Sequence, residues 1–264
     1  MKMTQEELNK GLTDAISERH AAAAEGFILL GADPNTVGQS TRSGIFMPAL
    51  SLAAEANHTG CVKVLLEAGA DPNIPDEEEQ TPLYFAVSHE NADTVQLLIG
   101  AGADILKYTS LNKVVLHVAS SHKNSDAVCL KLLLDAGADP NISYRDGLTP
   151  LHTAAHGGSV KCIEALLEAG ADINCCNNNG ETPLHYASYC SNIAIMKFLI
   201  KAGCDIRIKN RWNHDPLQTL ASSCPGKHRR SALGLFKLAE KERTKRLRAE
   251  DTRNTVNTGY EFDI

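Results

Sequence analysis

Histidine and cysteine give this chain of 264 residues its most evident chemical options. His152 and His156 are four residues apart, the spacing at which one helix face offers two ligands to zinc. Cys175 and Cys176 are adjacent, and because adjacent cysteines rarely pair with each other, their chemical option is a reactive thiol. The sequence contains no GxxxxGKS/T, HExxH or GxSxG motif and no GxGxxG after a strand. We therefore expect no catalytic, metal or cofactor site.

Two short motifs recur in phase and define the elements that carry these residues. Gly-Ala-Asp-Pro-Asn and its variants begin at residues 31, 69, 102, 137, 170 and 203, with spacings of 38, 33, 35, 33 and 33. Thr-Pro-Leu-His or Thr-Pro-Leu-Tyr begins at residues 81, 149 and 182. Two independent motifs at one period indicate a repeat protein.

One copy of the repeat predicts two antiparallel helices. Thr149 can cap the first helix, and Pro150 suits its first turn, where a backbone N–H is not needed. Apolar residues at helical spacing predict a second helix over about Val160–Ala169. Gly170 can adopt the positive φ that ends it. A single pair of this kind cannot bury its apolar face, so neighbouring pairs must stack.

These residues resemble the ankyrin repeat, whose period is about 33 residues and whose signature is Thr-Pro-Leu-His-x-Ala. The resemblance covers roughly residues 10–226 and implies an all-α solenoid of stacked helix-turn-helix units with hairpin loops. We expect one array over residues 1–226 and a basic C-terminal helix and tail over residues 227–264. The array comprises a cap at 1–38, repeats at about 39–73, 74–106, 107–141, 142–174 and 175–207, and a second cap from 208.

Two insertions interrupt the period. The first surplus of five residues fits the loop Thr36–Phe46, and the second, of two residues, fits the interhelical segment Ser120–Ser125. Loops tolerate such insertions at little cost.

The resemblance also gives the histidines a structural role. His117, His152 and His185 occupy equivalent repeat positions, and it implies that they hydrogen-bond neighbouring backbone rather than bind metal. Buried cysteines on second helices are expected to fill the core. The turn asparagines, such as Asn73 and Asn141, match residues that an asparaginyl hydroxylase modifies in many ankyrin proteins.

The net charge of −6 conceals an asymmetry. Residues 227–253 carry ten Lys or Arg and four Asp or Glu, so this segment is +6 and the rest of the chain is −12. We interpret it as a capping helix, with Leu233, Leu235, Phe236, Leu238 and Ala239 packing on the last repeat. A nuclear-localisation or nucleic-acid patch is the alternative. The acidic balance argues against nucleic acid as the main partner.

Protein binding is the function that the resemblance implies. Ankyrin proteins use a concave groove formed by hairpin tips and the outer ends of first helices. The repeat frame gives these candidate contacts: Glu77, Glu78, Ser88, His89, Tyr144, Arg145, Asp146, His156, Asn178, Asn179, Tyr189, Arg211 and Trp212. The sequence therefore predicts a groove that is acidic in its N-terminal half and aromatic and basic in its C-terminal half.

We therefore expect a non-catalytic adaptor, monomeric, that binds a partner protein and no small-molecule substrate. The absence of a long apolar run and of an apolar leader predicts no membrane segment and a cytoplasmic location with reduced thiols. Three alternatives stay open: a pathogen effector acting inside a host cell, a nuclear regulator that uses the basic segment, and an adaptor with a second module.

Overall fold

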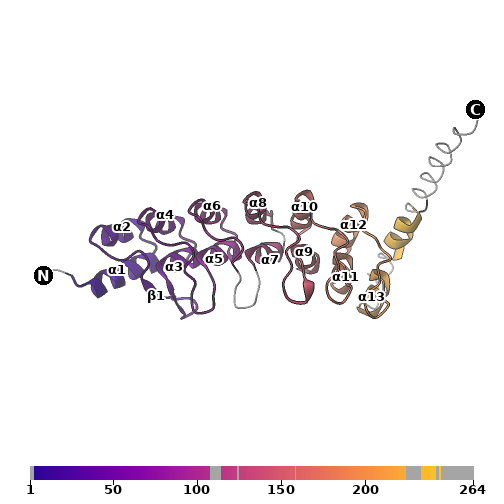
Figure 1. Cartoon of the computed structure of the whole chain (residues 1–264), viewed down its shortest axis with the longest axis horizontal. Helices are drawn as coiled ribbons and strands as arrows, with labels where there is room; N and C mark the ends of the chain where they lie inside the picture. Colours follow the sequence, from indigo (N-terminus) through magenta and orange to yellow (C-terminus); the bar gives the residue numbers. More distant parts are fainter. Residues whose placement is uncertain are drawn as a thin grey trace, which may run out of the picture. The chain divides into compact units, whose positions relative to one another are not determined.

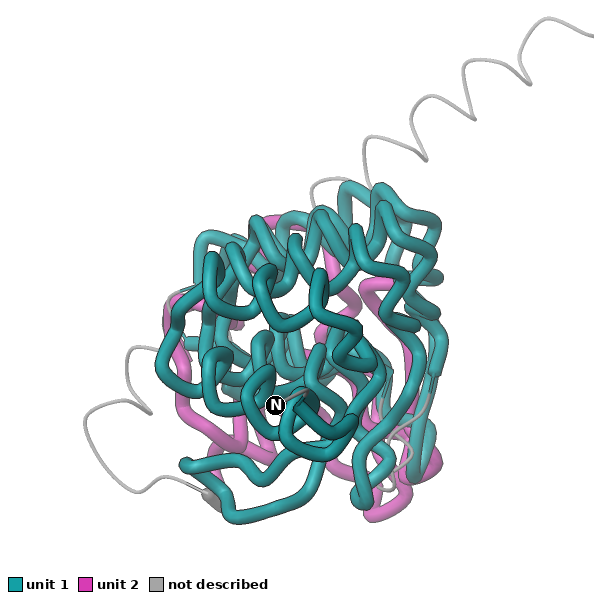
Figure 2. The backbone as a smooth tube through the Cα atoms, turned by 90° about the vertical axis from the view of Figure 1, so that its left-hand side faces the viewer, with its two compact units in different colours: residues 1–171 teal, residues 172–264 magenta. Residues whose placement is uncertain are grey.

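The computed structural model describes residues 3–107, 114–123, 125–157, 159–223, 233–241 and 244. The chain divides into two compact units, residues 1–171 and 172–264 (Figure 2). Eight of the ten Lys and Arg residues in the basic segment 227–253 lie outside the described residues.

Unit 1, residues 1–171, is a two-layer stack of helix pairs (Figure 1). The first helices are α1 (Gln5–Ser17), α3 (Ala49–Glu55), α5 (Pro82–Ser88), α7 (Val115–Ser120) and α9 (Pro150–Gly157). The second helices are α2 (Ala21–Leu29), α4 (Thr59–Glu67), α6 (Ala92–Gly100), α8 (Val128–Asp135) and α10 (Val160–Glu168). Each helix contacts its partner in the pair and the corresponding helix of the next pair, as expected for a solenoid.

The repeat motifs act as helix boundaries. The hydroxyl of Thr81 accepts a hydrogen bond of 3.3 Å from the N–H of Tyr84, and Pro82 occupies the first turn of α5. At the other end of the pair, Gly102 has a φ of +85°, which a side chain rarely tolerates. The start and stop signals that the sequence predicts are confirmed.

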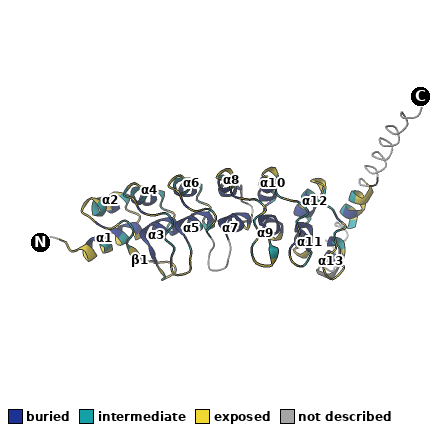
Figure 3. Cartoon of the chain, in the orientation of Figure 1, coloured by how far each residue is buried: buried dark blue, intermediate teal, exposed yellow. Residues whose placement is uncertain are grey.

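Leucine and alanine fill the core between the two layers (Figure 3). In the repeat that follows α8, Leu151, Ala154 and Ala155 of the first helix and Ile163 and Leu166 of the second are fully buried. Small alanines allow the helices to approach closely. This core explains why the chain needs few aromatic residues.

The first insertion is a short β-hairpin rather than the loop that the sequence predicts. Strand β1 (Val37–Gln39) pairs antiparallel with strand β2 (Phe46–Pro48). A Cβ at Gly38 would lie 2.7 Å from Thr13 Cγ2 and 2.9 Å from Leu52 Cδ1. Glycine at this position therefore lets the hairpin pack against α1 and α3.

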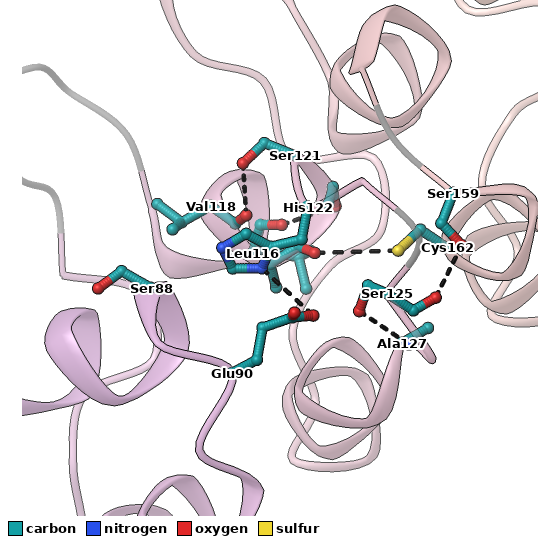
Figure 4. Close-up of polar contacts among 12 residues, drawn as sticks. Ser88, Glu90, Leu116, Val118, Ser121, His122, Ser125, Ala127, Ser159 and Cys162 are labelled. Atoms are coloured by element: carbon teal, nitrogen blue, oxygen red, sulfur yellow. Dashed lines mark hydrogen bonds and ion pairs between the residues drawn. The ribbon is translucent and has the colours of Figure 1, made fainter. Parts of the chain in front are cut away.

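The second insertion lies where the sequence places it, between α7 and α8. Seven residues join these helices, whereas three join α5 and α6. Ser125 organises the longer connection: its hydroxyl accepts from the N–H of Ala127 at 3.0 Å, and its carbonyl accepts from the hydroxyl of Ser159 at 2.8 Å (Figure 4). The extra residues are thus tied to the next repeat.

Unit 2, residues 172–264, contains α11 (Pro183–Tyr189), α12 (Ile193–Lys201), α13 (Pro216–Ser223) and a helical stretch at residues 233–241. Phe236 is buried, as expected for a residue of a capping helix. The expectation for Leu238 is wrong because its side chain is 55% exposed. Arg207 and Glu240 form an ion pair of 2.8 Å. It joins the helical stretch at residues 233–241 to the repeat turn that begins at residue 203.

Cysteines in the described residues are free thiols, and no helix in those residues is long and apolar enough to cross a membrane. Cys61, Cys129 and Cys162 are buried, which confirms their expected role as core residues. Burial raises the pKa of Cys61 and of Cys129 to about 11, so both thiols stay protonated at neutral pH.

The contact between α1 and α2 yields a stability prediction with a built-in control. A Cβ at Gly11 would lie 2.3 Å from the ring of Phe27, whereas a Cβ at Gly26 meets no atom within 4 Å. We expect Gly11→Ala to lower the free energy of unfolding by about 1–3 kcal/mol through overpacking. Gly26→Ala should raise it by about 0.5–1 kcal/mol, because alanine favours a helix interior. Urea unfolding followed by circular dichroism measures both, and equal effects of the two variants would contradict this packing.

Candidate functional site

The ends of the first helices form one row of equivalent positions within each unit. In unit 1 this row comprises Glu55, Ser88, Ser121 and His156, and Tyr189 holds the same position in unit 2. Ser88 is half-buried, whereas Ser121 and His156 are exposed. The predicted contacts Ser88 and His156 are therefore reachable from solvent.

His89, the residue after Ser88, is already engaged within the protein. Its Nδ1–H donates to the carbonyl of Phe85 at 2.8 Å, and its Nε2 lies 2.6 Å from Nη1 of Arg42. Because Nδ1 carries the proton in this arrangement, Nε2 is the acceptor. Arg42 comes from the tip of the first insertion, so the chain's own hairpin covers part of this predicted contact.

A neighbouring contact joins the connection between α5 and α6 to the second insertion. Nδ1 of His122 lies 3.6 Å from a carboxylate oxygen of Glu90 (Figure 4). His122 is half-buried and Glu90 is exposed. The two groups form an ion pair when the histidine is protonated.

The acidic hairpin of residues 76–80 is ordered by its own first residue. Oδ1 of Asp76 accepts hydrogen bonds from the N–H groups of Glu78 at 2.9 Å and Gln80 at 2.7 Å. This turn exposes Glu77 and Glu78. Oδ2 of Asp76 is buried and makes no hydrogen bond in the described residues. Desolvation, aided by the nearby glutamates, raises the pKa of Asp76.

The tip at residues 144–148 has a half-buried tyrosine and two exposed charged side chains. Tyr144 and Leu148 form a β-bridge, and Asp146 has a φ of +58° that closes the turn η1 (Arg145–Gly147). The Tyr144 ring packs edge-on against His117, with 4.4 Å between ring centroids. Arg145 and Asp146 are exposed. Tyr144 is therefore partly a packing residue, and the charged pair projects beyond it.

Unit 2 carries two hairpin tips that touch each other. Asn177 and Asn210 each order a tip as Asp76 does, by accepting two backbone N–H groups. The carbonyl of Asn179 accepts from the N–H of Arg211 at 2.8 Å, which joins the tips. Asn178 lies exposed beside this contact.

One aromatic side chain, Trp212, lies on the second of these tips. The Arg211 guanidinium lies 4.3 Å from the centroid of the Trp212 ring, and Trp212 is 49% exposed. A guanidinium over an indole face is a favourable cation–π contact. The chain's single Trp is therefore displayed to solvent and held by its neighbour.

Tyr189 is the second exposed aromatic residue of unit 2. Its hydroxyl donates to Oε1 of Glu181 at 2.5 Å, and its ring lies edge-on to Tyr186 with 6.1 Å between centroids. Desolvation and the Glu181 carboxylate raise the pKa of Tyr189 to about 12. The ring is 41% exposed yet fixed at its polar end.

The repeat histidines are structural, as the resemblance implies. His117, His152 and His185 are buried. Nδ1 of His185 accepts from the N–H of Thr182 at 3.0 Å, and its Nε2 lies 3.1 Å from the carbonyl of His214 in the next tip. Nδ1 of His152 accepts from the N–H of Thr149 in the same way. Within the described residues, no group of three His, Cys, Asp or Glu side chains could hold a metal ion.

A family model for ankyrin repeats matches residues 12–109 and 116–210, which is most of the chain. The protein belongs to the ankyrin repeat family. Ankyrin repeats are generally protein–protein interaction modules, so the exposed tips and helix ends of this ankyrin protein are the surfaces to consider for binding.

Solved ankyrin structures share the fold. The ankyrin repeat domain of human ASB11 is 26% identical, with a TM-score of 0.72, covering 85% of this chain and 96% of that one. The ankyrin repeat domain of Bcl-3, described as a unique member of the IkappaB protein family, is 24% identical, with a TM-score of 0.70, covering 86% and 97%. No curated protein matches the chain in a sequence comparison.

The sequence pattern does not predict two residues that hold candidate contact residues in place. Arg42 comes from an insertion that has no counterpart in the repeat, and the only sequence signal was the five surplus residues. Glu181, which holds Tyr189, is 5% exposed although it stands in a polar hairpin. Neither the contact of Arg42 with His89 nor that of Glu181 with Tyr189 follows from the 33-residue pattern.

The acidic hairpin gives a testable pH dependence. Asp76→Asn keeps the oxygen that accepts two N–H groups, as Asn177 and Asn210 do, and removes a buried charge. Because the folded-state pKa of Asp76 is raised above its ordinary 3.8, ionisation at neutral pH weakens the folded state. We expect Asp76→Asn to be more stable than wild type at pH 7 in urea unfolding. The difference should shrink as the pH falls through the folded-state pKa.

The control is Asp76→Ala, which removes the acceptor as well as the charge. This variant should lose about 1–3 kcal/mol of unfolding free energy, because two turn N–H groups lose their partner. Equal destabilisation by Asn and Ala would contradict the assigned role of Asp76.

Proposed function

We propose that this ankyrin protein is a non-catalytic adaptor that recognises a partner protein through its hairpin tips and first-helix ends. The observation that carries the proposal is the display of Trp212 and Tyr189 on the tips and first-helix end of unit 2. Each ring is exposed, and each is held by a polar neighbour, Arg211 or Glu181. Rigid, exposed Trp, Tyr and Arg side chains are the residue types that dominate binding energy at interfaces.

Charge supports a second contact in unit 1. Glu77 and Glu78 are exposed on a tip that Asp76 keeps in one conformation. An acidic tip attracts a basic segment and accelerates its association. Further predicted contacts are Ser88, His89, Arg145, Asp146 and His156 within unit 1, and Asn178 and Asn179 within unit 2. We place the protein in the cytoplasm, where its free thiols stay reduced.

Affinity purification with quantitative mass spectrometry tests the proposal. We compare wild type with Trp212→Ala and with the double variant Glu77→Lys/Glu78→Lys. Each should reduce recovery of the principal partner by about tenfold or more, the effect of losing about 1.4 kcal/mol of binding free energy.

Leu29→Ala is the matched control, because Leu29 is a large apolar side chain, 81% exposed, on a second helix. Its recovery of partner should equal that of wild type. Unchanged recovery by both test variants, or an equal loss with Leu29→Ala, would overturn the proposal.

A further inference from the structure

A small pocket in unit 1 lies where the tip of the first insertion meets the C-terminal ends of α1 and α3. Its volume is about 130 Å³, and its walls include Arg19, Arg42 and Glu55 above the apolar Leu52 and Ala56. A water-sized group needs about 10–15 Å³ by this kind of measure, so the pocket has room for a side-chain head group.

The tip of the insertion is held over the pocket by hydrogen bonds. The Ser40 hydroxyl is buried and donates to Oε2 of Glu55 at 2.5 Å. The hydroxyl oxygen of Ser40 in turn accepts hydrogen bonds from the N–H groups of Arg42 at 3.1 Å and Ser43 at 3.0 Å. Together with the bond from Arg42 to His89, these contacts fix the tip to the ends of α3 and α5.

The two arginines of the pocket have no anionic partner within the described residues. Arg19 donates to the carbonyl of Ala56, and Arg42 donates to His89. Neither forms an ion pair with a carboxylate in the part of the chain that the structure describes. This is notable in an array that carries an excess of acidic residues. The guanidinium group matches carboxylates in geometry and charge.

We propose that this pocket binds a carboxylate, delivered by an aspartate or glutamate side chain of the partner protein. Two guanidinium groups and the Glu55 carboxylate leave one net positive charge, which a single carboxylate neutralises. A phosphate dianion would leave an excess of negative charge beside Glu55. The inference rests on the proposed function, since a protein partner supplies the acidic residue.

Short blocked peptides test the pocket without the partner. The full chain is titrated, with NMR detection, with acetyl-Ala-Glu-Ala-amide, its Gln analogue and its phosphoserine analogue. We expect saturable shifts at residues 17–19 and 41–43 with the Glu peptide, and binding about fivefold weaker with Gln, the equivalent of losing an exposed ion pair.

Variants separate the charge from the fold of the tip. Arg19→Gln and Arg42→Gln should abolish the preference for Glu over Gln, whereas Lys63→Gln, on the exposed side of α4, should leave it unchanged. Glu55→Gln keeps an acceptor for Ser40, and it should tighten binding of the Glu peptide and admit the phosphoserine peptide.

Three results would overturn the inference: equal binding of Glu and Gln peptides, tighter binding of phosphoserine to wild type, or no change with Glu55→Gln. These outcomes concern the pocket alone. Because Trp212 lies in the other unit, loss of partner recovery on Trp212→Ala is a separate result.

Discussion

The fold depends on hydrogen bonds between successive repeats, in which an asparagine in the turn of one repeat bonds to the backbone of the turn in the next. Oδ1 of Asn73 accepts from the N–H of Asp104 at 2.7 Å, and its Nδ2 donates to the carbonyl of Gly102 at 3.1 Å. In unit 2, Oδ1 of Asn174 accepts from Asp205 at 2.7 Å. One side chain thus satisfies a donor and an acceptor of the following turn, and it fixes the spacing at which the apolar faces of the helix pairs meet.

This spacing places the hairpin tips and first-helix ends of each unit at equivalent positions in successive repeats. The side chains at these positions differ from one repeat to the next. Trp212 and Tyr189 replace the smaller or charged residues found at other tips and ends. Their polar neighbours restrict the rings before a partner arrives, so less conformational entropy is lost on binding. The Asp76 hairpin illustrates the cost of ordering a tip with a charged group, because desolvation raises the pKa of its buried carboxyl group.

The sequence predicts the repeats well because each motif residue meets one local structural requirement, either a helix boundary or a buried helix face. Thr81, Pro82 and Gly102 mark helix boundaries, and Leu and Ala at helical spacing mark the core. The pattern also finds Trp212 and Tyr189 at exposed positions. It does not find the β-hairpin at residues 37–48 or the contact of Arg42 with His89, because both depend on how an insertion folds back on helices distant in sequence. The prediction that Leu238 packs on the last repeat fails for a related reason. An apolar residue in a short terminal helix need not face the preceding repeat.

Hydrogen exchange of the full chain, alone and with the partner recovered by affinity purification, tests the central claim most directly. If the partner binds the tips and first-helix ends, amides at residues 76–80, 177–181 and 210–214 gain protection, and those of α4, α6, α8 and α10 do not change. Protection confined to these second helices would contradict the account, because it would place the partner on the opposite layer.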